Sequence, residues 1–176
     1  MKNLIASLLI LASVRAASQE MVFGDTAMIR SIQTKCSTIY DRKDSTTFLL
    51  TRVLFSDEAT GGTNLSVDSY KKKISRIVAF TTTSKGLLGV EFYYWGSSII
   101  MIYETMEYFE EDSPKGQIRN FRNIPYWESR FYFANNKLVG HKHTGRMGIG
   151  SNYQALKEIG NAKKVFEFVR EHTSLN

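Results

Sequence analysis

The residues of this chain that could do chemistry gather in one stretch, ESRFYFANNKLVGHKHTGRMGIG, at positions 128 to 150. It contains two histidines two positions apart, His141 and His143, with a carboxylate, Glu128, and a guanidinium, Arg130, upstream. Imidazole nitrogen and carboxylate oxygen suit zinc or non-haem iron. A histidine oriented by a carboxylate can also act as a general base. Either chemistry requires that the strands carrying these residues bring the side chains together.

The stretch predicts a β-hairpin. Two strand-like runs, WESRFYFA and KLVGHKHT, flank Asn135-Asn136, and asparagine tolerates the left-handed conformation that a tight turn requires. With the turn there, regular pairing sets four pairs opposite each other: Phe133 with Leu138, Tyr132 with Val139, Arg130 with His141, and Glu128 with His143. The period of two then sends the large rings inward. It predicts one outer face made of Glu128, Arg130, Tyr132, His141 and His143.

Three interpretations of this outer face are open: an ordinary polar sheet surface, a ligand-binding face and a metal site. Arg130 beside His141 disfavours the metal, because a fixed positive charge repels a divalent ion. Pairing of Glu128 with His143 also has a purely structural use, since cross-strand pairs stabilise a sheet by roughly 0.2 to 1 kcal/mol. The run GRMGIG lacks the strand–loop–helix setting of a phosphate-cradling loop. No metal and no cofactor are therefore predicted.

The first 18 residues predict an export signal. Lys2 is followed by an apolar run from Leu4 to Val14 and by small residues at a plausible cleavage point. The run is shorter than the roughly 18 to 20 residues that span a bilayer, and no cysteine follows it for lipid attachment. The predicted location is extracytoplasmic, either periplasmic or secreted, without a stable membrane anchor.

Charge indicates the class of partner. The full chain carries +6, and removal of Lys2 and Arg15 with the signal leaves +4. The densest basic spot is Lys71-Lys72-Lys73, which favours anionic partners such as lipid head groups or acidic cell-wall polymers. A solvated strand end is the plain alternative. Export disfavours nucleic acid as a partner.

Cys36 is the only cysteine, so no disulfide can form within the chain. It lies in line with Ile29, Ile32 and Ile39 at helical spacing, which predicts a buried, small hydrophobic side chain rather than a nucleophile.

The periodicities predict one α+β domain over residues 19–176. An N-terminal helix from Asp25 to Tyr40 is expected, with Asp25 as N-cap, and a C-terminal helix over 152–172 that Gly160-Asn161 can break. The helices should pack on one face of an antiparallel meander sheet of five or six strands. The strands are predicted in the late hairpin and at 46–55, 71–83, 86–95 and 97–109; loops are predicted at 56–66 and 110–125.

Aromatic residues give a second possible signal. Phe92 and Tyr94 point to one side of their strand, and Tyr93 and Trp95 point to the other. Those that are not core could form an exposed platform for sugars or peptides. A packed face under the long loop is the equal alternative.

The run WESRFYFANNKLVGHKH, preceded by LLGVEFYYWGSSIIMIYETMEYF, resembles a pattern in small exported bacterial proteins of uncharacterised function. The resemblance covers residues 71 to 144, and its motif is the hairpin. It implies a helix followed by a meander, and an extracytoplasmic location. It carries over no catalytic residues.

These observations predict an extracytoplasmic domain that acts by binding, without catalysis. The expected partner is a protein, a peptide or a glycan of the cell envelope, contacted through the five-residue outer face. The alternative is a hydrolase of an envelope polymer, with His141 or His143 as general base and Glu128 orienting it. A third hypothesis is a module that pairs through a free sheet edge. The oligomeric state is not predicted.

Overall fold

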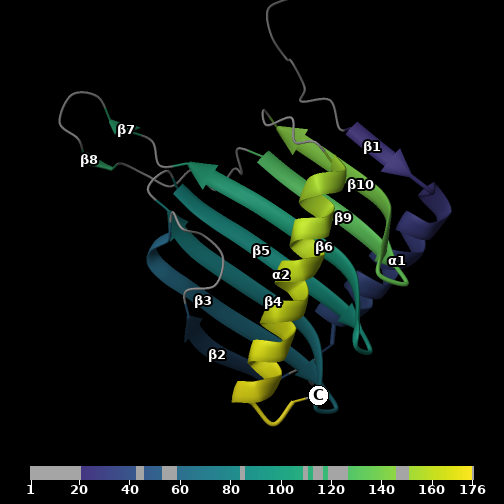
Figure 1. Cartoon of the computed structure of the whole chain (residues 1–176), viewed down its shortest axis with the longest axis horizontal. Coiled ribbons are helices and arrows are strands. Elements are labelled where there is room, and N and C mark those ends of the chain that lie inside the picture. The colour runs from purple at the N-terminus through teal and green to yellow at the C-terminus, as the bar shows by residue number, and fades with distance from the viewer. Residues whose placement is uncertain are drawn as a thin grey trace, which may run out of the picture.

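A computed structural model describes residues 21–42, 46–52, 59–83, 86–108, 111–112, 117–118, 127–145 and 151–175. The predicted export signal and most of the predicted 110–125 loop lie outside these residues. These described residues form an eight-stranded antiparallel sheet with one helix on each face (Figure 1). The elements are β1 Met21–Gly24, α1 Thr26–Tyr40, β2 Thr46–Arg52, β3 Ala59–Tyr70, β4 Lys73–Thr83, β5 Gly86–Trp95, β6 Ser98–Tyr108, β7 Glu111–Asp112, β8 Gln117–Ile118, β9 Trp127–Ala134, β10 Lys137–Gly145 and α2 Ser151–His172.

The strand order is β1-β10-β9-β6-β5-β4-β3-β2, and β7 and β8 form a separate two-stranded sheet. Seven strands of the large sheet follow one another as a meander from β2 to β10, and β1 adds to the free edge of β10. The predicted α+β class with a single antiparallel meander is therefore confirmed. The sheet exceeds the predicted five or six strands because β1 and β3 were not expected.

Strand β3 replaces much of the loop that the sequence predicted at 56–66. The glycine pair at positions 61 and 62 suggested a loop, but Thr63, Leu65 and Val67 alternate as buried residues with more exposed polar ones. This period of two is that of a strand with one buried face. The apolar pattern therefore outweighs the glycines.

The two helices lie on opposite faces of the sheet, so the prediction that both pack on one face is wrong. Side chains that alternate along β5 enter different clusters: Phe92 packs with Val165 and Val169 of α2, whereas Tyr93 packs with Ile32 and other residues of α1. The central strands carry apolar side chains on both faces, and each face needs its own cover. Figure 1 shows α2 crossing one face and α1 behind the other.

Helix α1 begins and packs as the sequence predicts. The Oδ1 atom of Asp25 accepts hydrogen bonds from the backbone nitrogens of Ala27 at 2.9 Å and Met28 at 3.1 Å. These bonds satisfy donors that the first turn of a helix leaves without partners. The buried stripe consists of Ile29, Ile32, Cys36 and Ile39.

Helix α2 runs without interruption through Gly160, so the break that Gly160-Asn161 could introduce does not occur. Its buried residues are Ala162, Val165, Phe168 and Val169. Neither helix in the described part of the chain combines the length and the apolar character needed to cross a membrane.

A β-bulge in β10 joins the edge of the sheet to α1. Leu138 pairs with Phe133 and Gly140 with Tyr132, so Val139 is an extra residue without a partner on β9. The Val139 carbonyl accepts a hydrogen bond from the backbone nitrogen of Asp25 at 3.3 Å. Ile29 packs directly on Gly140, where an added Cβ would lie 2.5 Å from Ile29 Cδ1. The bulge therefore positions the start of α1.

We predict opposite effects for two glycine-to-alanine substitutions. Gly140→Ala should destabilise the fold by about 1 to 3 kcal/mol, because its methyl group overlaps the packed Ile29 side chain. Gly160→Ala should stabilise it by about 0.5 to 1 kcal/mol, because a Cβ there meets nothing within 4 Å and alanine favours a helix. Urea unfolding of both variants measures these changes. Equal effects would contradict the close packing of α1 on β10.

We also predict that Cys36 reacts slowly in the folded protein. The thiol is buried and lies 3.9 Å from Met101 Sδ, and burial raises its pKa to about 12, with a further contribution from Glu91. The nucleophilic thiolate is therefore scarce at neutral pH. A thiol reagent such as dithiobisnitrobenzoate should label Cys36 only at the rate at which the protein opens. Labelling as fast in buffer as in denaturant would show that the α1 interface is open.

Candidate functional site

The five side chains predicted to form one outer face are divided between the two faces of the sheet. Phe133 pairs with Leu138 as predicted, but beyond the bulge the register slips by one residue. His141 lies opposite Phe131, and His143 lies opposite Ser129. The predicted pairs of His141 with Arg130 and of His143 with Glu128 are therefore wrong. The predicted pair of Tyr132 with Val139 is also replaced, by Tyr132 with Gly140. A one-residue slip moves every later side chain to the other face.

His141 and His143 lie on the α2 side of the sheet and are buried. The His141 ring stacks on Phe131 with centroids 4.5 Å apart, and Ser129 Oγ lies 2.8 Å from His143 Nδ1. Neither ring nitrogen of His141 has a hydrogen-bond partner within the described part of the chain. Burial lowers the pKa of His141, and His143 lowers it further. These imidazoles behave as core side chains.

Glu128, Arg130 and Tyr132 lie on the α1 side. Tyr132 is fully buried, and its hydroxyl accepts a hydrogen bond from Gln33 Nε2 at 3.1 Å. Arg130 Nη2 lies 2.9 Å from Glu128 Oε2, and its guanidinium lies 4.4 Å from the centre of the Tyr103 ring. Because the sheet separates Glu128 from both histidines, it cannot orient either as a general base. A contact between a ligand and Glu128 or Arg130 stays a prediction.

No group of three or more His, Cys, Asp or Glu side chains suited to a metal ion occurs among the residues with described positions.

Cations and aromatic rings gather instead at one end of the sheet, here called the turn end. Consecutive hairpin turns of a meander alternate between its two ends, so the β3–β4, β5–β6 and β9–β10 turns meet at the same end. Two cavities open there. The first, here called the rim pocket, has a volume of about 250 Å³ and is lined by Arg42, Tyr70, Lys71, Lys73, Ile74, Ser75, Tyr94, Trp95 and Gly96.

Three cations lie over two aromatic rings at the rim pocket. The Arg42 guanidinium lies 4.3 Å from the centre of the Tyr70 ring and 5.6 Å from that of Trp95. Lys71 Nζ lies 5.2 Å from the Tyr70 ring, and Lys35 Nζ lies 5.7 Å from the Trp95 ring. Cation–π attraction helps to hold these groups over the two rings. The described residues that line the pocket include no acid. This arrangement suits an anion.

The lysines of the β3–β4 turn adopt an unfavourable backbone conformation. Tyr70 pairs with Lys73, so the turn has two residues, and Lys71 and Lys72 have φ of 51° and 62°. The left-handed region costs a residue with a side chain roughly 1 to 2 kcal/mol, and such turns favour Asn-Gly. Asn135 and Asn136, with φ of 51° and 59°, fill the equivalent turn between β9 and β10 as predicted. Strain of this kind is often found at functional sites.

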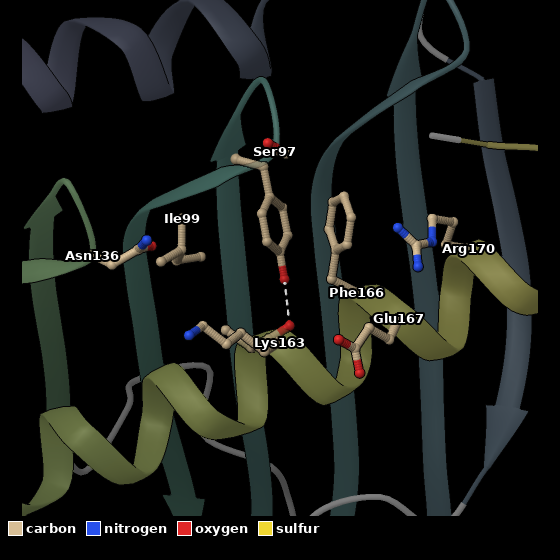
Figure 2. Close-up of a pocket in the computed structure, with 9 residues that line it drawn as sticks. Ser97, Ile99, Asn136, Lys163, Phe166, Glu167 and Arg170 are labelled. Carbon is tan, nitrogen blue, oxygen red and sulfur yellow. Dashed lines mark hydrogen bonds between the residues drawn. The ribbon is translucent and has the colours of Figure 1, made fainter.

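The second cavity, here called the helix pocket, lies between α2 and the sheet and has a volume of about 360 Å³. Figure 2 shows Lys163, Glu167 and Arg170 along α2 and Ser97 and Asn136 from the turns. The remaining lining residues are mostly apolar: Tyr94, Ile99, Ala162 and Phe166. The Tyr94 hydroxyl donates a hydrogen bond to the Ala162 carbonyl at 3.0 Å. Burial raises the pKa of the Tyr94 hydroxyl. Tyr94 lines both cavities.

The sequence indicated parts of this site but not its assembly. The basic run at Lys71 predicted anionic partners, and Trp95 was a candidate for an exposed aromatic platform. Arg42, Tyr70 and Arg170 were missed. The alternation of turns could have found Tyr70, because it places the ends of β3 and β5 at one end of the sheet. It could not have found Arg42, which follows α1, or Arg170, which lies in α2.

Comparisons with protein-family models, with curated proteins and with solved structures give no match for this chain. The resemblance to small exported bacterial proteins therefore stays a prediction.

We predict that stability falls in mild acid. The pKa of His141 is lower in the folded chain than the value of about 6.5 expected when unfolded, so the unfolded chain binds more protons below that pH. Stability is full above about pH 6.5 and is lost as pH falls from there toward the folded-state pKa. His141→Phe removes this titration and keeps a ring against Phe131. Urea unfolding from pH 8 to pH 5 should show a shallower loss in the variant; identical slopes would contradict the buried, neutral imidazole.

Proposed function

We propose that this chain is a non-catalytic binding domain and that its ligand carries negative charge in the rim pocket. The observation that carries this proposal is the arrangement of Arg42, Lys71 and Lys35 around the rings of Tyr70 and Trp95. Lys71 and Lys73 line this pocket, and lysine ammonium groups attract phosphate, sulfate or carboxylate oxygens. The two rings supply rigid contact area beside those donors.

The energetics of the free pocket support an anionic ligand. Lys71 and Lys73 both line the rim pocket, and like charges that line one cavity repel one another. Lys71 and Lys72 add backbone strain in a turn that other residues would fill more stably. An anion would relieve the repulsion, so the same features that destabilise the free protein favour the complex.

The proposed location is extracytoplasmic, and the partner is an acidic molecule of the cell envelope. Among proteins, peptides and glycans, the rim favours those with exposed phosphate, sulfate or carboxylate groups. A modest positive charge also speeds encounter with such surfaces at low salt.

We predict that replacing the strained turn separates stability from binding. Lys71→Asn with Lys72→Gly should stabilise the fold by about 1 kcal/mol or more, because Asn-Gly suits a left-handed two-residue turn. The same change should weaken binding of inorganic tripolyphosphate about fivefold or more, since it removes two cations. Unfolding in urea and isothermal titration calorimetry measure the two quantities.

A matched control removes the same charge elsewhere. Lys157→Ala with Lys164→Ala deletes two exposed cations of α2 that line neither cavity. This variant should bind tripolyphosphate as the native chain does. Equal weakening in both variants would indicate attraction by net charge alone, and absence of binding by the native chain would refute the proposal.

A further inference from the structure

The rim pocket and the helix pocket adjoin at Tyr94, and their chemistry differs. We infer that the ligand is an anionic amphiphile, with its charged head group in the rim pocket and its apolar chain in the helix pocket. This inference rests on the proposed function, because it assigns the anionic end of the ligand to the rim. It extends that proposal by naming the kind of molecule that carries the charged group, which is an amphiphile.

The helix pocket has an apolar lining where the alkyl chain of the ligand would lie. The Tyr94 and Phe166 rings have centroids 4.9 Å apart and are tilted by 50°, and Ile99 and Ala162 complete the apolar lining. The only polar atom of the Tyr94 side chain is already bonded to the Ala162 carbonyl. The Tyr94 ring therefore faces both cavities. An apolar chain can lie against this ring without leaving the Tyr94 hydroxyl unsatisfied, because the hydroxyl keeps its bond to Ala162.

The two cavities open beside the same turn. Gly96 lines the rim pocket and the next residue, Ser97, lines the helix pocket. Gly96 has φ of 67°, and a Cβ added to it would meet nothing within 4 Å. Gly96 itself therefore places no side chain between the two cavities. In the inferred complex the ligand extends from one cavity into the other beside Tyr94.

Charge at the mouth of the helix pocket matches an anionic rather than a neutral amphiphile. Lys163 and Arg170 stand at opposite sides of the pocket in Figure 2, with Glu167 between them on α2. Together with the cations of the rim pocket they give the surroundings of the cavities a positive balance. Each cavity lies near or below the lower end of the usual range for small-ligand sites, about 300 to 1,000 Å³. The two together fit a head group and a short chain.

The test is a chain-length series of alkyl phosphates, with methyl, butyl and octyl phosphate used below their micelle concentrations. Each methylene that enters the helix pocket should tighten binding by up to about fourfold. We expect octyl phosphate to bind at least tenfold more tightly than methyl phosphate by isothermal titration calorimetry. Equal affinities along the series would overturn the inference.

Two variants locate the chain. Ser97→Trp, on an exposed turn, fills the mouth of the helix pocket with little risk to folding, and Phe166→Asp places a carboxylate in its apolar lining. Both should abolish the dependence on chain length. Phe80→Asp is the matched control, because Phe80 is exposed on the α1 side of the sheet. It should keep the dependence, and persistence of the dependence in Ser97→Trp would overturn the inference.

Tripolyphosphate distinguishes this inference from the proposed function. It carries charge without a chain, so Ser97→Trp should leave its affinity unchanged. If tripolyphosphate binds and all alkyl phosphates bind with the same affinity, the proposed anion site in the rim pocket is supported and the amphiphile is refuted. If neither tripolyphosphate nor any alkyl phosphate binds, both proposals fail.

Discussion

The extra residue Val139 determines how the two halves of the molecule meet. Its carbonyl accepts a hydrogen bond from the backbone nitrogen of Asp25, and its side chain packs with the buried residues of α1. The Ile29 side chain packs on the next residue, Gly140. The same insertion turns His141 and His143 toward α2. A β-bulge is a local backbone feature with a large effect, because every later side chain of the strand changes face. Without it, α1 would lack its anchor and the imidazoles would face the α1 side of the sheet.

Two covered faces leave the ends of the sheet as the natural place for a binding site. Helix α1 buries Tyr93 and Met101 on one face, and α2 buries Phe92 and Phe131 on the other. At the turn end the helices no longer close the structure. The hairpin turns, Arg42 beyond the end of α1 and the second half of α2 meet there around Tyr94 and Trp95. Rigid scaffolds commonly carry function on such loops.

The sequence predicts those features that depend on local patterns. The Asp25 cap, the stripe through Cys36 and the paired asparagines are set by neighbouring residues, and all three occur. The bulge at Val139 is not predictable in this way, because its cause is the distant contact of Gly140 with Ile29 and of Val139 with Asp25. The predicted outer face depended on unbroken pairing and failed with it. The prediction that both helices pack on one face was wrong for a related reason. Whether both faces of a sheet need a covering helix depends on the whole sheet and not on a local pattern.

The imidazoles and the turn lysines show two opposite ways of managing charge. His141 sits against Phe131 with a lowered pKa, so burial keeps it neutral and adds nothing that a ligand can use. Lys71 is exposed to water, beside the Tyr70 ring, on a strained turn. Burial suppresses the chemistry that the sequence suggests for the histidines, whereas exposure preserves that of the lysine. Residue type alone therefore points to the histidines, whereas the position of each charge relative to solvent points to the turn end.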